Sequence, residues 1–182
     1  MNARRAQRGL NIIELMVAVA LLVLLTMFAL PMYRLWMQNS QLRASAESIM
    51  SALQFARAEA VRLNESQGVR FVLAGNDWQV LRVSNAELLR QGLGADLAPK
   101  AALVADPAPN TMVTFTALGR AVDAANAPIT ANFNVNHADT GEKCILDGGD
   151  MRCLRVQVRS GGLVRLCDPS VTTAGDPRLC LP

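Results

Sequence analysis

The feature that most constrains this chain is an apolar run near its N-terminus. From Leu10 to Leu30 every residue is apolar except Asn11, Glu14 and Thr26. A helix needs about 20 apolar residues to cross a bilayer. We therefore expect one transmembrane helix at about 10–31, attached to a domain of ordinary soluble composition.

The charges in front of this run predict the orientation of the helix. Three of the 18 basic residues, Arg4, Arg5 and Arg8, precede it, and the first nine residues contain no acid. Positive residues before a span favour a cytoplasmic N-terminus, so the rest of the chain is expected outside the cytoplasm. Beyond Gly9 the basic residues equal the 15 acidic residues in number. A global attraction to nucleic acid is therefore not supported.

The cysteines indicate an oxidising compartment. Cys144, Cys153, Cys167 and Cys180 form no C-x-x-C pair, and His137 is the only histidine. Zinc or iron–sulfur binding is a poor interpretation, and two disulfides are a better one. Of the three pairings that four cysteines allow, we expect Cys144–Cys153 and Cys167–Cys180, because each closes a short loop rich in turn residues.

An ionisable residue inside the apolar run requires an explanation. A charge at mid-membrane costs roughly 2.5–3.5 kcal/mol on insertion scales. Glu14 lies four residues after Leu10, near the cytoplasmic end, and a partner cation would stabilise its short carboxylate. Pro31 closes the run, and a proline inside a helix removes one hydrogen bond and predicts a kink.

These residues resemble the class III signal of type IV prepilins and type II secretion pseudopilins. In that family a basic leader ends in Gly, and the first mature residue is N-methylated after cleavage. Gly9 matches the cleavage position, Leu10 becomes the first mature residue, and Glu14 and Pro31 fall at mature positions five and 22. Two residues depart from the pattern, because Leu10 replaces the usual Phe and Asn11 the usual Thr.

The resemblance implies a leader at 1–9, an N-terminal helix at 10–64 and a periplasmic β-rich head at 65–182. It implies cleavage by the inner-membrane prepilin peptidase, and assembly with other pilins or pseudopilins at an inner-membrane platform. In the family, the carboxylate corresponding to Glu14 neutralises a neighbour's N-terminal amine. The alternatives are an ordinary signal peptide, although no A-x-A site directly follows the apolar run, and a plain bitopic membrane protein.

The pattern after Pro31 predicts a continuing helix followed by strands. Apolar residues recur at three- and four-residue steps up to about Asn64. Alternating apolar runs and turn residues then predict an antiparallel β head, so the fold class is α+β. The expected strands are Val69–Leu73, Trp78–Val83, Met112–Thr116, Ile129–Val135, Leu154–Arg159 and Leu163–Cys167, with a short one around Ala102–Val104 inside a loop from Gly92 to Asn110.

Two segments of the head are similar to the FimT/GspH-type minor pilins. Phe115–Arg120 matches their "F-x-x-x-G-R" stretch, and Leu53–Ala60 matches "L-x-x-A-R-x-E-A". Members of this family are minor pilins that prime and cap type IV pili, DNA-binding pilins for transformation, or minor pseudopilins of type II secretion. The cysteine-bounded tail resembles pilus members, so a pilus priming role is expected first.

Three arginines are candidate DNA contacts. Arg155 and Arg159 would share one strand face, and Arg165 follows on the next strand. DNA-binding relatives use a "G-R-x-R" turn here, but Leu163 occupies its first arginine position, so only Arg165 carries over. The alternative is a solvated strand face.

No catalytic or cofactor site is expected. Asp147 and Asp150 flank two glycines and could ligate calcium, but two aspartates are too few, and a turn is the better interpretation. His137 lacks a nucleophile at suitable spacing. We expect a non-enzyme without cofactor or metal, and a membrane-anchored periplasmic hydrolase is the alternative.

Overall fold

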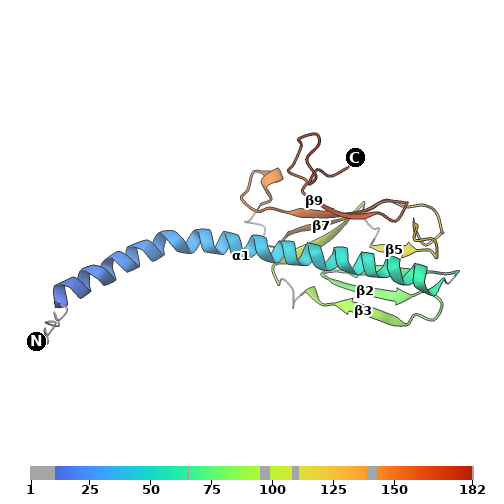
Figure 1. Ribbon diagram of the computed structural model, residues 1–182, viewed down its shortest axis with the longest axis horizontal. Helices are drawn as coiled ribbons and strands as arrows, with labels where there is room; N and C mark the ends of the chain where they lie inside the picture. The colour runs from blue at the N-terminus through green and yellow to red at the C-terminus, as the bar shows by residue number, and fades with distance from the viewer. Residues whose placement is uncertain (1–10, 65, 95–98, 108–110, 139–142, 182) are drawn as a thin grey trace, which may run out of the picture. The chain divides into compact units, whose positions relative to one another are not determined.

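The computed structural model describes residues 11–64, 66–94, 99–107, 111–138 and 143–181. The chain divides into two compact units, Met1–Met37 and Gln38–Pro182. The first contains the beginning of the long helix α1, and the second contains the rest of α1 with all the strands (Figure 1).

Helix α1 extends over Ile12–Leu63, close to the predicted range. Leu10 lies outside the described residues, so the predicted beginning there stays untested. The helix ends as expected, because Asn64 adopts a left-handed φ of 49° and its N–H donates to the Ala60 carbonyl at 3.2 Å. Asparagine tolerates this conformation and so commonly terminates helices.

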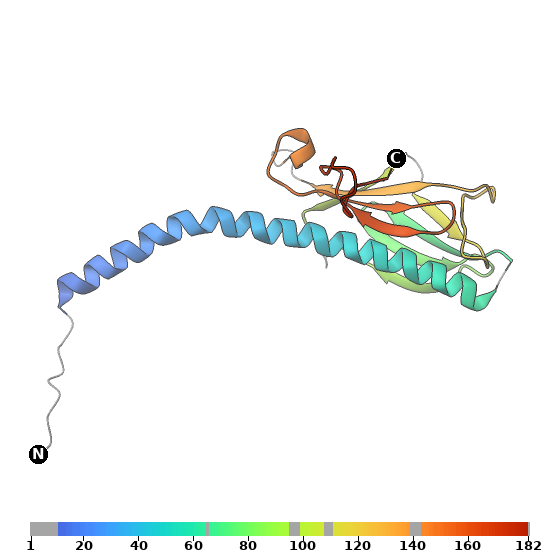
Figure 2. The ribbon, with the colours of Figure 1, turned by 45° about the horizontal axis from the view of Figure 1, so that its top comes forward.

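In the second unit α1 packs on the β-sheets through a stripe of aliphatic side chains, and Figures 1 and 2 show it running along both. The buried residues of the stripe are Leu42, Ala46, Ile49, Ala52, Leu53, Ala56 and Ala60. Four of them are alanines. Trp78 donates from Nε1 to Ser48 Oγ at 3.2 Å, and Arg90 lies over the Phe55 ring. The predicted packing of the helix against the head is confirmed.

The first sheet has five antiparallel strands in the order β3-β2-β1-β5-β6. Their bounds are β1 Val69–Ala74, β2 Asp77–Arg82, β3 Leu88–Gly92, β5 Met112–Phe115 and β6 Ala121–Val122. Strands β3 and β6 were not predicted from the sequence. The side chains of β3 are largely exposed and do not alternate, and β6 has only two residues, so neither carries a periodic signal.

The second sheet has four antiparallel strands in the order β4-β7-β8-β9. Their bounds are β4 Ala101–Asp106, β7 Ala131–His137, β8 Leu154–Val158 and β9 Val164–Cys167. The strand expected within the Gly92–Asn110 loop is longer than predicted, and β7 begins two residues later. A short 3-10 helix, η1 (Ile145–Asp147), precedes β8.

The two sheets meet around three aromatic rings. Phe71 on β1 lies edge-on to Phe133 on β7 with ring centroids 5.3 Å apart, and it stacks near Trp78 at 6.4 Å. All three side chains are buried. The Ala121 N–H also donates to the Ser160 carbonyl at 3.0 Å, joining β6 to the β8–β9 turn. The α+β fold class, a long helix packed on antiparallel sheets, is confirmed.

Candidate functional site

The first unit presents a continuous apolar surface to its surroundings. Side chains from Ile12 to Met32 are exposed, including Leu15 at 56% and Phe28 at 75%. By length and composition, α1 is the one helix in the described residues that could cross a membrane. Its one hydroxyl in this stretch is satisfied locally, because Thr26 donates to the Val23 carbonyl at 2.8 Å. Such a surface requires lipid or other apolar helices around it.

Glu14 lies in the first turn of α1. A carboxylate is favourable there, because the helix dipole places partial positive charge at the N-terminus. The cleavage residues Gly9 and Leu10 lie outside the described residues, so the predicted cleavage and N-methylation stay predictions. Pro31 lies within the helix, which continues beyond it to Leu63, and the kink also stays a prediction.

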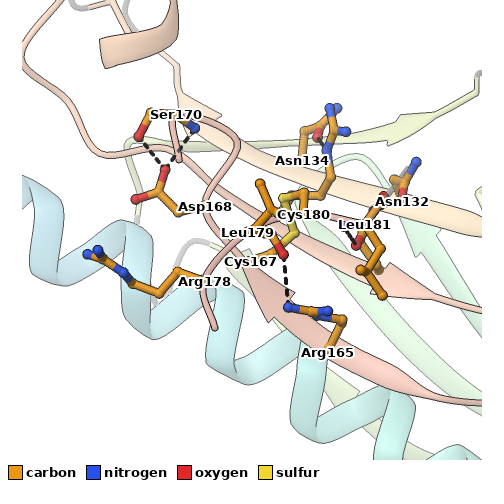
Figure 3. Close-up of a disulfide and its surroundings, with 12 residues drawn as sticks. Asn132, Asn134, Arg165, Cys167, Asp168, Ser170, Arg178, Leu179, Cys180 and Leu181 are labelled. Carbon is orange, nitrogen blue, oxygen red and sulfur yellow. Dashed lines mark hydrogen bonds between the residues drawn. A yellow bond between two sulfur atoms is a disulfide. The ribbon is translucent and has the colours of Figure 1, made fainter. Parts of the chain in front are cut away.

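Two disulfides hold the C-terminal part of the head. Cys144 is bonded to Cys153 with the Cα atoms 5.5 Å apart, and Cys167 to Cys180 at 5.0 Å. This is the sequential pairing that the short loops favour. The first bridge closes the loop that contains η1, and the second returns the C-terminal tail to the end of β9 (Figure 3).

The tail is hydrogen-bonded across the β8–β9 face. Arg165 donates to the Pro177 and Leu179 carbonyls at 3.0 and 2.9 Å. Gln157, which is buried, exchanges two hydrogen bonds of 3.0 Å with the backbone of Leu181. At the start of the tail, buried Asp168 accepts bonds from the Ser170 backbone and hydroxyl (Figure 3). The tail is therefore an integral layer of the head.

The candidate DNA arginines make contacts within the head. Arg155 donates to Asn134 Oδ1 at 2.6 Å and lies 3.6 Å from the Asp106 carboxylate. Arg165 donates hydrogen bonds to the tail carbonyls, as described above. The Arg159 side chain is half-buried and has a partner within the protein. Arg155 lies on β8 and Arg165 on the neighbouring β9, whereas Arg159 lies one residue beyond the end of β8. Their hydrogen bonds support a structural role rather than a free basic face.

We therefore expect full-length protein in detergent to show no salt-sensitive DNA binding in a gel-shift. Phosphate contacts would weaken steeply as salt rises, because condensed counterions are released on binding. Arg165→Ala should leave any residual shift unchanged. A complex that is lost both at higher salt and in Arg165→Ala would contradict the structural assignment.

The candidate metal and catalytic residues lie on separate elements of the head. Asp147 ends η1 and His137 ends β7. Within the described ranges, no group of three or more His, Cys, Asp or Glu side chains is arranged to hold a metal ion.

A contact between the two head motifs could not be read from the sequence. Gly119, in the turn after β5, and Gly162, in the turn before β9, both adopt left-handed φ angles, of 72° and 80°. A Cβ on Gly119 would lie 3.2 Å from the Arg57 Nε, and one on Gly162 would lie 1.8 Å from the Gly119 carbonyl oxygen. The "A-R-x-E-A" helix segment and the "F-x-x-x-G-R" turn therefore pack together. The glycines at positions 119 and 162 were the one sequence signal of this contact.

The ion pair between Asp176 and Arg178 in the tail should lower the pKa of Asp176. Hydrogen bonds from the Arg178 side chain and backbone lower the pKa of Asp176 from its ordinary 3.8 to about 2. Because the folded-state pKa is depressed, the pair's contribution to stability is complete above the ordinary value and is lost as pH falls through about 2. An NMR titration should show this pKa, and Arg178→Ala should return it toward normal. An unchanged pKa in that variant would refute the assignment.

A long exposed apolar helix joined to a disulfide-bonded α+β head defines a membrane-anchored, pilin-like protein. The family model described as type II transport protein GspH matches residues 45–162, so the chain belongs to the GspH family. A crystal structure of the type IV minor pilin FimU from Pseudomonas aeruginosa is similar, with a TM-score of 0.51 and 21% identity over 70% of this chain and 97% of that one. Among curated proteins, no sequence matches this chain.

Proposed function

We propose that this chain is a minor pilin that takes part in type IV pilus assembly at the priming or tip complex. The observation that carries the proposal is the exposed apolar segment of α1, with Glu14 in its first turn, in a chain with a GspH-family head. The prepilin peptidase would cut between Gly9 and Leu10, and Leu10 would be N-methylated. Before assembly, the protein would lie in the inner membrane with its N-terminus cytoplasmic and its head periplasmic.

Assembly follows from the physical cost of the charges in lipid. The Glu14 carboxylate and the new N-terminal amine are both costly alone in the bilayer. Paired between neighbouring subunits, they would compensate each other and set the register of the helices. The exposed aliphatic side chains would be buried in the helical bundle as the assembly platform extracts the chain from the membrane. In this mechanism the chain itself needs no catalytic residue and no cofactor.

A minor pseudopilin of type II secretion is the alternative role. The two disulfides, and the tail that one of them fastens, support a pilus member. The FimU structure has the same fold. At 21% identity this similarity supports the architecture of the chain and does not decide between the two roles. The family description itself refers to type II transport.

A deletion strain separates these roles. We expect loss of surface pili in sheared fractions, normal secretion of exoproteins, and restoration of pili by the wild-type gene. Normal piliation with lost secretion would assign the chain to the secretion pseudopilus. If both processes were unaffected, the proposed function would be wrong.

A further inference from the structure

We propose that an exposed surface of the head docks an acidic, apolar segment on the head of a neighbouring subunit. This basic-apolar surface consists of Arg57, Val61, Leu118, Arg120 and Leu163. The proposal rests on the proposed function, because it presumes co-assembly with other subunits. It adds a head-to-head contact to the association that the N-terminal helices supply.

The surface lies around the turn after β5 and includes parts of two shallow grooves. Arg57, Val61 and Leu163 line one groove, and Leu118 and Arg120 line the other. Gly119 connects them, because a Cβ at that position would lie 3.2 Å from Arg57 Nε and 3.3 Å from Val61 Cγ2. The two grooves therefore adjoin at Gly119, and the five residues, which come from α1 and from two turns, lie around it.

The apolar members of this patch are at least half exposed. Val61 is 50% exposed, Leu163 53% and Leu118 81%. A single exposed leucine needs no explanation, but three apolar side chains around one turn mark a candidate contact surface. Their burial against a partner would remove apolar area from water.

The charged members of the patch have no ion-pair partner among the residues that the structure describes. In the described residues, no ion pair or hydrogen bond engages the guanidinium of Arg57 or Arg120, whereas Arg43 and Arg62 on the same helix pair with Glu47 and Glu59. None of the residues that line the two grooves is acidic. The nearest acid to Arg120 in sequence is Asp123, whose carboxylate caps its own turn by accepting from two backbone N–H groups at 2.9 Å.

The two arginines therefore favour an anionic partner. The apolar side chains indicate whether that partner is a nucleic acid or a protein. A phosphate backbone would satisfy the two arginines but leave Val61, Leu118 and Leu163 without apolar contacts. A protein segment that carries both carboxylates and aliphatic groups satisfies all five side chains. Arginine at the edge of an apolar contact also provides paired hydrogen bonds to carboxylates.

Photo-crosslinking of the full-length protein in cells that assemble fibres tests this proposal. A benzophenone amino acid at position 118 or 163 should crosslink to another subunit next to acidic residues, whereas the same probe at the exposed Leu146 should not. The double variant Arg57→Glu, Arg120→Glu should lower the yield several-fold, and Arg57→Lys, Arg120→Lys, which keeps the charge but not the paired hydrogen bonds, should give an intermediate yield. Replacing the partner's acids by arginine should restore the yield with the double Glu variant.

The failures are distinguishable. If the chain is present in fibres but the probes at 118 and 163 give no subunit crosslink, or one insensitive to charge reversal, the docking surface is wrong and the proposed function stands. Crosslinks to DNA alone would also overturn the docking proposal. If the chain never enters fibres, the proposed function fails, and the docking proposal fails with it.

Discussion

Replacing Glu14 by leucine is expected to remove the chain from assembled fibres while leaving it in the membrane. The substitution makes the apolar segment of α1 more hydrophobic, so insertion should not suffer. It would, however, leave a neighbour's N-terminal amine buried without its partner. Breaking a buried ion pair in this way costs about 3–5 kcal/mol, and even the lower value corresponds to roughly a hundredfold weaker association.

The measurement is the amount of chain in sheared fibres relative to the amount in the inner membrane. Glu47→Gln is the matched control, because it neutralises an exposed carboxylate on the same helix, which pairs with Arg43. We expect the control to assemble normally, since exposed pairs contribute little. Fibre levels of Glu14→Leu equal to wild type would show that the carboxylate has no role in assembly.

Alanine at Gly162 is expected to destabilise the head severely. The φ angle of 80° is unfavourable for a residue with a Cβ, and that Cβ would lie 1.8 Å from the Gly119 carbonyl oxygen. A left-handed conformation costs about 1–2 kcal/mol, and overpacking costs about 1–3 kcal/mol more. We therefore expect the free energy of unfolding to fall by about 2–5 kcal/mol.

Gly161→Ala is the control, because a Cβ there meets no atom within 4 Å. It should change stability by less than about 0.5 kcal/mol. Urea unfolding of the full chain in detergent can be followed by the fluorescence of buried Trp78, with the exposed Trp36 replaced by phenylalanine. Equal midpoints for the two alanine variants would show that the turns do not pack as described.

The sequence predicted the elements of this fold that carry a strong periodic signal. The helix to Leu63 and strands such as β1 and β8 were expected close to their observed bounds, because their buried side chains recur at helical or strand spacing. Strand β3 was missed because it is an exposed edge strand whose pairing with β2 contains a bulge. Its position depends on a partner strand, which local pattern cannot supply.

The candidate site was only partly predictable for a related reason. The spacing of Arg155 and Arg165 correctly placed them on neighbouring strands. Nothing in the spacing shows that the tail returns over β9 and that Pro177 and Leu179 accept hydrogen bonds from Arg165. Because of these long-range contacts, Arg165 holds the tail in place and is not part of a free basic face. The same limitation concealed the contact of Arg57 with the two glycine turns.

The mass of the mature protein taken from fibres tests the central claim most directly. If the chain is a processed pilin, its N-terminal residue is Leu10, and the intact mass corresponds to residues 10–182 with two disulfides and one added methyl group. A protein that begins at Met1 would show that the basic leader is not removed. One that begins near residue 31 would show that the apolar run is an ordinary signal peptide, and either result would contradict the account.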